Sequence, residues 1–279
     1  MVGEPVRGAA STPGSAVLIT GAAGGIGRAL AWRWAREDAR LALVDVDVSG
    51  VEALSAELTA AGHEALALPC DVTDEAACRE AVGRAVERFG TVNVVVANAG
   101  MTHLSPVAET DVSVFRRVMD VNFFGAVNVV LAALPEVRRR RGRIVVLSSV
   151  AGFAPLSGRS GYAASKHALH GFFGSLRGEL AGEGVSVTLV CPSFVRTRIG
   201  DGALGGDGGP ATRPRTETGT PMEPEAVADA LVRAALRRRS LLVLGSVGRT
   251  AWWLWRLAPW LYERLMVRRL LREQIRAAR

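Results

Sequence analysis

Short apolar runs alternate with longer amphipathic stretches along most of the chain. Each apolar run is rich in β-branched or aliphatic residues, as expected for a strand that is buried on both faces. The stretches between the runs have helical spacing, and several end at glycine, which is typical of helix C-termini. The predicted strands are 16–20, 41–45, 65–69, 92–97, 143–148 and 185–190. The predicted helices are 24–38, 51–62, 74–90, 111–141 and 160–181.

This alternation of strand and helix predicts an α/β fold with a doubly wound parallel sheet. The Gly and Pro residues are scattered evenly through residue 195, so we predict one large domain over residues 15–248. Ligands of such sheets bind beyond the carboxyl ends of the strands. The residues that directly follow each apolar run are therefore the candidate site.

Composition narrows the class of protein. Hydrophobic residues make up 49% of the 279 residues, enough to bury a sizeable core. The net charge is +7, but residues 249–279 contain eight arginines and two glutamates and so carry +6 of it. The rest of the chain is nearly neutral, which argues against nucleic-acid binding.

Cysteine usage and the N-terminal segment bear on the compartment. Cys70, Cys78 and Cys191 form no CxxC pair, and their odd number favours a reducing compartment over a disulfide framework. We interpret all three as small buried apolar side chains. Residues 1–14 show no apolar signal segment and are predicted to be a flexible tail. No uninterrupted apolar run reaches about 18 residues, so we expect no membrane-spanning helix. Together with the cysteine usage, this predicts a cytoplasmic location.

A glycine-rich segment, TGAAGGIG at 20–27, follows the first predicted strand and opens a helix. Gly21 can form the tight turn, Gly25 can let the backbone approach a pyrophosphate, and Gly27 can allow close helix packing. The N–H groups and dipole at the start of a helix attract phosphates, so this loop, with Ile26, is the candidate dinucleotide cradle. An ordinary tight connection between a strand and a helix is the alternative.

The second predicted strand ends in Asp45, 18 residues after Gly27. A carboxylate at this distance can accept the adenosine ribose hydroxyls and repel a 2′-phosphate. No arginine or lysine lies just before Gly25 or just after Asp45, so NAD is predicted in preference to NADP. Asp45 as a cap of the next helix is the alternative. After the third strand, Asp71 and Val72 can bound the adenine, with a helix-start acid as an equally plausible reading.

Lys166 is the only lysine among 34 Lys and Arg residues, and Tyr162 is one of two tyrosines. Residues i and i+4 of a helix share a face, so both side chains can project toward one cleft. A phenol that ionises near neutral pH needs its pKa lowered by ~3 units, or ~4 kcal/mol. One cation at ~4 Å in an effective dielectric of ~20 is worth ~4 kcal/mol, so a single ammonium is sufficient. A compact, rotatable ammonium suits this position better than a planar guanidinium; a solvated helix lysine is the alternative.

Ser149 follows the fifth predicted strand, and its hydroxyl can hydrogen-bond a substrate carbonyl in the same cleft; Ser148 is the competing candidate. The surrounding side chains are mostly apolar, which favours an apolar, steroid-like or lipid-like alcohol or ketone, unless they pack the core. His103 is a candidate polar contact. His167 and His170 lack a carboxylate or cysteine at suitable spacing, so no metal site is predicted. The predicted substrate-binding residues are Met101, Ser149, Phe153, Leu156, Tyr162 and Phe194.

Several motifs together resemble the short-chain dehydrogenase/reductase family over residues 15–240. The resemblance implies a seven-stranded Rossmann-type sheet with strand order 3-2-1-4-5-6-7. It also implies that Asn122, Ser149, Tyr162 and Lys166 form the catalytic set, in which Asn122 helps to hold a water chain for the proton. The motifs are TGAAGGIG, ANAG at 97–100, DVNFFG at 120–125, Ser149, YAASK at 162–166 and PSFVRT at 192–197.

The same resemblance assigns a cofactor site. Asp45 corresponds to the NAD-selecting acid, Asn98 to a residue that steadies the sheet, and Thr197 to a contact of the nicotinamide amide. The chain departs from the family where it has AN for a frequent double asparagine and Ser193 for the glycine frequent after Pro192. The predicted cofactor-binding residues are Gly21, Gly25, Ile26, Gly27, Asp45, Asp71, Val72, Asn98, Ala99, Gly100, Tyr162, Lys166, Pro192, Val195 and Thr197.

The predicted activity is therefore NAD-dependent interconversion of an apolar secondary alcohol and its ketone, with Tyr162 as the acid–base group. The alternatives are an NADP-dependent carbonyl reductase, or a non-catalytic protein that senses the nucleotide or acts as a scaffold. We expect a homodimer or homotetramer.

Two further segments are distinct in composition. Residues 198–221 are rich in Gly, Pro and Thr and are predicted to be a mobile substrate loop. Residues 249–279 contain four of the six tryptophans, and Trp with Arg suits a bilayer interface. Pro259 is predicted to divide this extension into two short helices. The alternative is that the extension packs on its own subunit or across a dimer and covers the substrate entrance.

Overall fold

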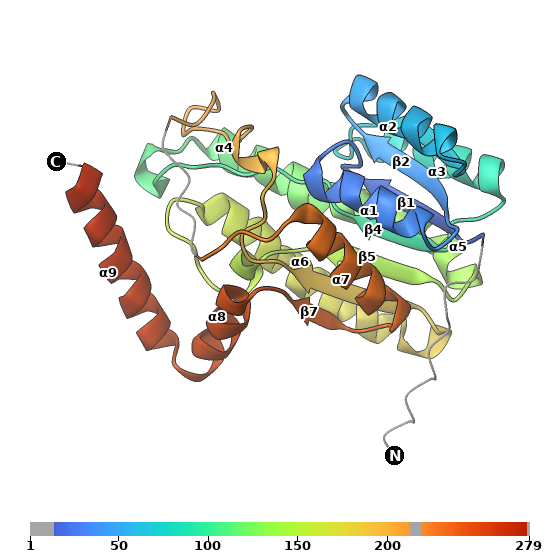
Figure 1. The fold of residues 1–279 in the computed structure, drawn as a ribbon. Coiled ribbons are helices and arrows are strands. Elements are labelled where there is room, and N and C mark those ends of the chain that lie inside the picture. The colour runs from blue at the N-terminus through green and yellow to red at the C-terminus, as the bar shows by residue number, and fades with distance from the viewer. Residues whose placement is uncertain (1–13, 213–218, 278–279) are drawn as a thin grey trace, which may run out of the picture.

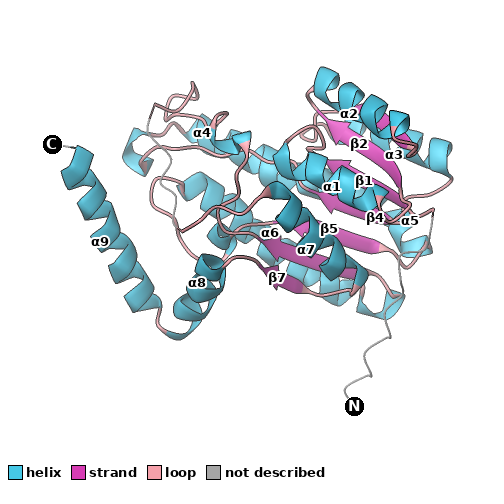
Figure 2. Cartoon of the chain, viewed as in Figure 1, coloured by secondary structure: helices cyan, strands magenta, loops and turns pink. Residues whose placement is uncertain are grey.

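Seven parallel strands form one sheet in the order β3-β2-β1-β4-β5-β6-β7 (Figure 2). The computed structural model describes residues 14–212 and 219–277. The predicted α/β class and the strand order implied by the family resemblance are both confirmed. The strands are β1 (Ala16–Thr20), β2 (Arg40–Asp45), β3 (Ala65–Pro69), β4 (Val94–Ala97), β5 (Arg143–Leu147), β6 (Ser186–Cys191) and β7 (Leu241–Val243).

Helices cover both faces of the sheet (Figure 1), and each face has its own buried apolar cluster. Because both faces are covered, β1, β4 and β5 are buried along their whole length, which explains their unbroken apolar runs. One face carries α1 (Gly25–Ala35), α2 (Val48–Ala60) and α7 (Pro224–Leu236). The other carries α3 (Glu75–Phe89), α5 (Gly125–Arg139) and α6 (Ser160–Glu179).

The predicted helix 111–141 consists of three pieces that run on from one another. A π-helical turn, Asp120–Phe124, joins α4 (Val112–Met119) to α5. Such turns occur mostly at functional sites, and this one carries Asn122, whose predicted role is catalytic. The sequence pattern indicates the helix but not the turn, because the apolar spacing hardly changes across it.

The same helix bears on the expectation that no helix spans a membrane. By length and composition alone, Val112–Arg139 is apolar enough to cross a membrane, although we expected no such helix among the predicted elements. The expectation was based on an unbroken apolar run, whereas this helix mixes small, apolar and polar residues. Of its most apolar window, 44% is buried inside the molecule. Val129, Val130 and Ala133 belong to the core cluster on the sheet, so this face of the helix is committed to packing.

The C-terminal extension forms α8 (Ser246–Leu257) and α9 (Pro259–Ala277). Pro259 begins α9, so the predicted break is confirmed, but α9 has 19 residues and is not short. Ala251 of α8 lies in a buried cluster with Val150 and Phe153. The Tyr262 hydroxyl donates to the Pro155 carbonyl at 3.0 Å. The extension therefore packs on its own subunit through α8 and the first turn of α9.

Part of the predicted mobile loop 198–221 is built into the fold. Leu204 N–H donates to Thr102 O at 3.0 Å, and Leu204 O accepts from Leu104 N–H at 2.8 Å. Ala203 and Leu204 are buried, so burial and backbone pairing hold this stretch despite its glycines. Residues 213–218, in the same loop, and the predicted flexible tail up to residue 13 lie outside the described residues.

Candidate functional site

Three glycines shape the turn between β1 and α1. Gly21 has a φ of +64°, a conformation that other L residues rarely adopt. A Cβ on Gly27 would lie 1.9 Å from Gly21 O, so only glycine lets α1 begin this close to the turn. A Cβ on Gly25 would lie 2.8 Å from Thr197 Cγ2. The structure thus brings Thr197, the predicted nicotinamide contact, against the glycine loop.

Thr20 and Asn98 hold the loops after β1 and β4 together. Thr20 Oγ1 accepts from the N–H groups of Asn98 and Ala99, each at 3.0 Å. Asn98 Nδ2 donates to Thr20 O at 2.8 Å and to Gly21 O at 3.1 Å. The sequence analysis missed Thr20 because a threonine at a strand end is an ordinary β-former. Its position at the end of the strand that precedes the glycine loop is the one signal that could have identified it.

Asp45 faces the glycine loop from the end of β2. One carboxylate oxygen accepts from Ala23 N–H at 2.8 Å, and the other accepts from Asp47 N–H at 3.0 Å. Asp47, not Asp45, is the N-cap of α2, since its carboxylate accepts from Gly50 N–H at 3.0 Å. The helix-cap alternative for Asp45 is therefore excluded. Asp45 is fixed beside the loop where the adenosine ribose of a dinucleotide is expected.

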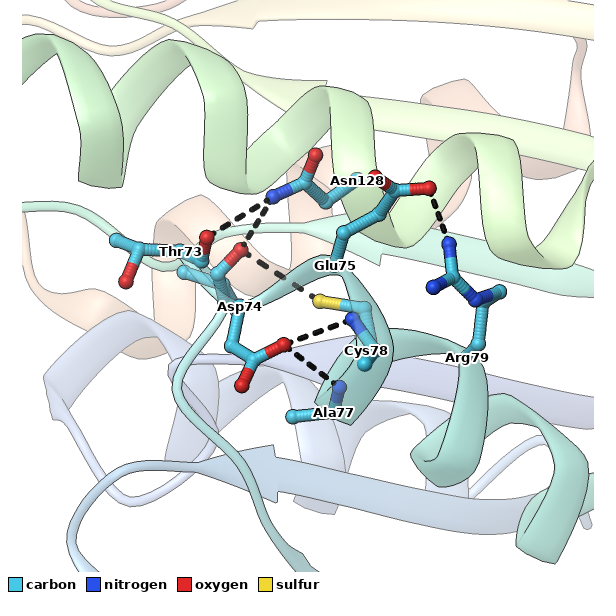
Figure 3. Close-up of polar contacts among 9 residues, drawn as sticks. Thr73, Asp74, Glu75, Ala77, Cys78, Arg79 and Asn128 are labelled. Atoms are coloured by element: carbon cyan, nitrogen blue, oxygen red, sulfur yellow. Dashed lines mark hydrogen bonds and ion pairs between the residues drawn. The ribbon is translucent and has the colours of Figure 1, made fainter.

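The loop between β3 and α3 is pinned from two sides (Figure 3). Asp74 is the N-cap of α3 and accepts from the N–H groups of Ala76 and Ala77. Asn128 Nδ2 of α5 donates to Val72 O at 3.0 Å. Asp71, which is not the cap, accepts instead from the N–H and the hydroxyl of Thr73. The two predicted adenine neighbours, Asp71 and Val72, thus lie in one well-fixed loop, with Val72 buried.

Lys166 and Tyr162 lie one turn apart on α6 and face each other. Lys166 Nζ lies 5.7 Å from the centre of the Tyr162 ring and donates to Leu147 O at 2.9 Å. The lysine is only 4% exposed, and this burial lowers its pKa from 10.5 to about 8. The ammonium therefore stays charged at neutral pH beside a half-buried phenol. The alternative of a solvated helix lysine is excluded.

Asn122 joins the loop after β4 to α6. Its Oδ1 accepts from Met101 N–H at 2.8 Å, and its Nδ2 donates to Met101 O at 3.0 Å and to Ser165 Oγ at 2.9 Å. Ser165 Oγ in turn donates to Tyr162 O at 2.8 Å. Both Asn122 Oδ1 and Lys166 Nζ lie within 4 Å of the point where a Cβ of Gly100 would stand. The structure thus brings Asn122, Lys166 and the strand-four loop to one place.

The two serines after β5 have different environments, which decides between them. Ser148 is buried, donates to Lys166 O at 3.3 Å and lies 3.0 Å from His170 Nε2. Ser149 is half-buried, and its Oγ accepts from Ala151 N–H at 3.2 Å. That bond uses the oxygen as an acceptor and leaves the hydroxyl hydrogen available for donation. Ser149 is therefore the better candidate for contact with a substrate oxygen.

Two residues predicted near the substrate, His103 and Phe153, also have partners within the protein. His103 is fully buried, and its Nε2 accepts from Gly161 N–H at 2.9 Å at the start of α6. Burial lowers the pKa of His103 from its ordinary value of 6.5, so the ring is neutral at neutral pH and caps the start of α6. Phe153 packs edge-on against Trp252 at 4.8 Å between ring centres. The sequence places Phe153 four residues after Ser149 and His103 shortly after the fourth predicted strand, but it does not show that His103 contacts α6 or that Phe153 contacts α8.

The remaining predicted substrate and cofactor contacts lie in the segments that follow β4, β5 and β6. Met101, Leu156 and Phe194 are half-buried. Pro192 O accepts from Val150 N–H at 3.1 Å, and Val195 pairs with Met222 in a short bridge. The first contact holds the segment after β6 next to the segment after β5, as the adjacency of the two strands requires, and the second holds it next to the segment that precedes α7.

A hollow of about 340 Å³ lies between α6 and α8, and Phe153 is part of its lining. Its lining includes His167 and His170, and burial lowers the pKa of His170 to about 4. Across the described ranges, no group of three or more His, Cys, Asp or Glu side chains is arranged to hold a metal ion. His170 lies instead between Ser148 and Cys191, at 3.0 Å and 3.4 Å.

The residues after the strands fit a dinucleotide. No side chain caps α1, whose N-cap is Gly24, so the N–H groups of its first turn can receive phosphates. The glycine loop leaves no Cβ in the way of close approach, and Asp45 stands at its other side with an acceptor carboxylate. Thr197 lies against Gly25 of this loop, and the Tyr162–Lys166 pair lies beside the loop after β4.

Comparison with known proteins gives the class. The family model described as short chain dehydrogenase matches residues 15–203. The chain therefore belongs to the short-chain dehydrogenase/reductase family and is an NAD(P)-dependent oxidoreductase.

Individual relatives refine this picture. The chain is 35% identical to "Dehydrogenase/reductase SDR family member 7B" of Xenopus tropicalis, covering 97% of this chain and 90% of the relative. It is 33% identical to "Dehydrogenase/reductase SDR family protein 7-like" of Drosophila melanogaster, covering 93% and 82%. Among solved structures, a short-chain dehydrogenase/reductase from Burkholderia phymatum in complex with NAD is similar at a TM-score of 0.76 and 28% identity, covering 85% and 92%. An alcohol dehydrogenase from Thermococcus sibiricus complexed with 5-hydroxy-NADP is similar at 0.72 and 28%, covering 84% and 97%.

Proposed function

We propose that the protein interconverts an apolar secondary alcohol and its ketone, with NAD as the preferred cofactor. The observation that carries this proposal is the buried ammonium of Lys166, 5.7 Å from the centre of the Tyr162 ring. A fixed cation at this position favours the ionised form of the phenol, which is the form that can accept a proton. No other lysine or tyrosine pair in the sequence offers this arrangement.

In alcohol oxidation, the Tyr162 phenolate takes the proton of the substrate hydroxyl. Ser149 donates a hydrogen bond to the same substrate oxygen and orients it. Lys166 stabilises the phenolate, and the bidentate contact of Asn122 with Met101 holds the loop on which the substrate lies. A bound nicotinamide supplies the hydride acceptor, or the donor in the direction of ketone reduction. Ketone reduction returns the proton from Tyr162 to the substrate oxygen.

The preference for NAD rests on Asp45. Its carboxylate is held beside the glycine loop by Ala23 and Asp47 N–H groups, so it cannot swing away from a bound ribose without losing both bonds. A 2′-phosphate at this ribose would lie next to a negative charge. Asp45→Asn keeps an acceptor for Ala23 N–H and removes the charge. We expect the ratio of kcat/KM with NADP to kcat/KM with NAD to rise by about tenfold or more, since like-charge repulsion of this kind costs at least ~1.4 kcal/mol.

The substrate class rests on the side chains that flank Ser149. Met101, Leu156 and Phe194 are apolar and half-buried, so each keeps surface that a ligand can cover. A small polar alcohol would leave this surface wet, whereas an extended apolar ketone would cover it. A turnover screen of short polar and long apolar secondary alcohols, with each cofactor, ranks the substrates by kcat/KM.

Tyr162→Phe tests the chemistry itself. The substitution removes only the hydroxyl, so the ring remains to pack on α6. We expect kcat to fall by about 10²-fold or more, because a positioned acid–base group contributes at least that much. Cofactor binding, measured by fluorescence titration, reports whether the site is otherwise intact. Retention of more than a tenth of the wild-type turnover would show that Tyr162 is not the acid–base group.

A further inference from the structure

The C-terminal arm, residues 246–277, has an inner and an outer face. On the inner face of α8, Ala251 is buried and Trp252 and Trp255 pack on the cluster that contains Phe153. On the outer face, Trp253 is 62% exposed and Leu257, one turn later, is 77% exposed. The arm is thus anchored by one side, and the other side presents large apolar side chains to solvent.

Exposed apolar side chains also occur on α9, where Trp260 is 64% exposed and Leu265 and Val267 are about half exposed. Across the described residues, 11 large hydrophobic side chains are exposed, and five of them lie in this arm. The two tryptophans among those 11, Trp253 and Trp260, are both in the arm. An exposed tryptophan is costly in water, so this concentration indicates a binding surface.

Positive charge is interleaved with the apolar residues. Arg249, Arg256, Arg264 and Arg268 are all exposed. From residue 249 to the end, the sequence has eight arginines against two glutamates, while the remaining 248 residues are nearly neutral. The Arg256 guanidinium lies over the Trp252 ring at 4.0 Å, which directs its charge to the rim of the inner face.

We propose that the C-terminal arm docks on an anionic lipid surface. Tryptophan rings are stable at the depth of the headgroups, and leucine and valine reach the acyl boundary. Arginines extend their stems along the apolar surface and place their charge at the lipid phosphates. A second copy of the arm is a poor occupant, because two arms of net +5 would repel each other. An anionic bilayer offers apolar depth and negative charge together.

Docking in this way orients the molecule. Figure 1 shows α9 on the same side of the molecule as α4, which follows the loop after β4. A docked arm would therefore lie on the side of the molecule that carries α4. The proposal does not depend on the reaction, because lipid binding is measured without turnover.

Vesicle flotation of the full chain is the experiment that tests this. The probes are vesicles of phosphatidylcholine, with and without phosphatidylserine. We expect binding only when phosphatidylserine is present, and weaker binding at high salt, which shortens the screening length. Trp253→Ser combined with Trp260→Ser should lower the partition coefficient by about tenfold or more. Arg264→Gln combined with Arg268→Gln should lower it by about 25-fold, at roughly fivefold for each arginine.

Two double variants serve as matched controls. Val107→Ser with Val112→Ser removes side chains that are each 62% exposed on the catalytic domain. Arg79→Gln with Arg88→Gln removes two exposed arginines of α3. Both should float like the wild type, and circular dichroism and cofactor titration should show that every variant is folded.

Three outcomes would overturn the proposal. The full chain would fail to float with anionic vesicles, would float equally well with neutral ones, or would float undiminished after the tryptophan or arginine substitutions. If, instead, the tryptophan variant changed the oligomeric state in sedimentation without any vesicle binding by the wild type, the outer face would be a contact between copies of the chain.

Discussion

Replacing Lys166 by methionine should make the protein more stable and almost inactive. Methionine has nearly the same volume and length and carries no charge, so it can occupy the same buried space. The folded protein lowers the pKa of Lys166 from 10.5 to about 8 by burial. That difference of about 2.5 units corresponds to roughly 3 kcal/mol of unfavourable free energy for the charged form at neutral pH.

The variant also loses the hydrogen bond to Leu147 O, which leaves a carbonyl without that donor at a cost of about 1–2 kcal/mol. The net expected effect is a stabilisation of about 1–2 kcal/mol at pH 7. For a domain of this size that raises the melting temperature by roughly 2–8 °C. Calorimetry or urea denaturation of the cofactor-free proteins measures it.

The pH dependence gives the sharper test. Below pH 8 the lysine is charged in both folded and unfolded states, and the full penalty is present. Between about 8 and 10.5 the folded state has lost the proton while the unfolded state still holds it, so the wild type gains stability as pH rises. The stability difference between Lys166→Met and the wild type should therefore shrink across this window. A constant difference, or a variant that is less stable at pH 7, would refute a buried charged lysine.

Activity should change in the opposite direction to stability. One cation near the phenol is worth ~4 kcal/mol, so Lys166→Met should lower kcat by roughly 10³-fold. Lys166→Arg is the matched control for charge: it retains a cation but replaces a compact ammonium by a larger planar group. Both variants should be nearly inactive, and only Lys166→Met should be stabilised.

Two further substitutions test the glycine loop and the hydrogen bonds of Asn122. Gly27→Ala would place a methyl group 1.9 Å from Gly21 O. It should lower the free energy of unfolding by about 1–3 kcal/mol and the cofactor affinity by at least tenfold, as measured by urea denaturation and cofactor titration. The control is Gly83→Ala in α3, where a Cβ meets no atom within 4 Å; this variant should be neutral or stabilising in the same assays. Asn122→Ala removes the partner of the half-buried Met101 N–H and C=O groups and should destabilise the protein by about 2–3 kcal/mol. An equal stability of the two proteins in urea would show that these bonds are not maintained in solution.

The sheet and its order could be predicted because parallel strands covered on both faces appear as unbroken apolar runs. The predicted strand 92–97 starts two residues early. Asn93 Oδ1 accepts a hydrogen bond from Ala16 N–H, and the pairing of β4 with β1 begins only at Val94. β7 has only three half-buried residues, too few to give a pattern. The family resemblance supplied that strand, and the hydrophobic periodicity did not.

The catalytic centre could be predicted in part for a different reason. Lys166 and Tyr162 are rare residue types at helical spacing, so their chemistry is visible along the chain. The residues that hold them are common types whose partners are distant in sequence. Thr20 bonds to residues 98 and 99, and His103 caps a helix that begins at residue 160. No local pattern separates such a buried polar residue from an exposed one.

The helix formed by the π turn and α5 links the loop after β3 to the loop after β4, and only the structure shows this link. Asn128 of α5 donates to Val72 O at the adenine end, and Asn122, six residues earlier in the adjoining π turn, grips Met101 at the catalytic end. Because a helix is rigid over so short a span, the distance between these two loops is fixed before any ligand arrives. Preorganisation of this kind reduces the ordering that cofactor binding must impose. Two polar residues of a helix that is apolar enough to resemble a membrane span, Asn122 and Asn128, thus hold the site in place.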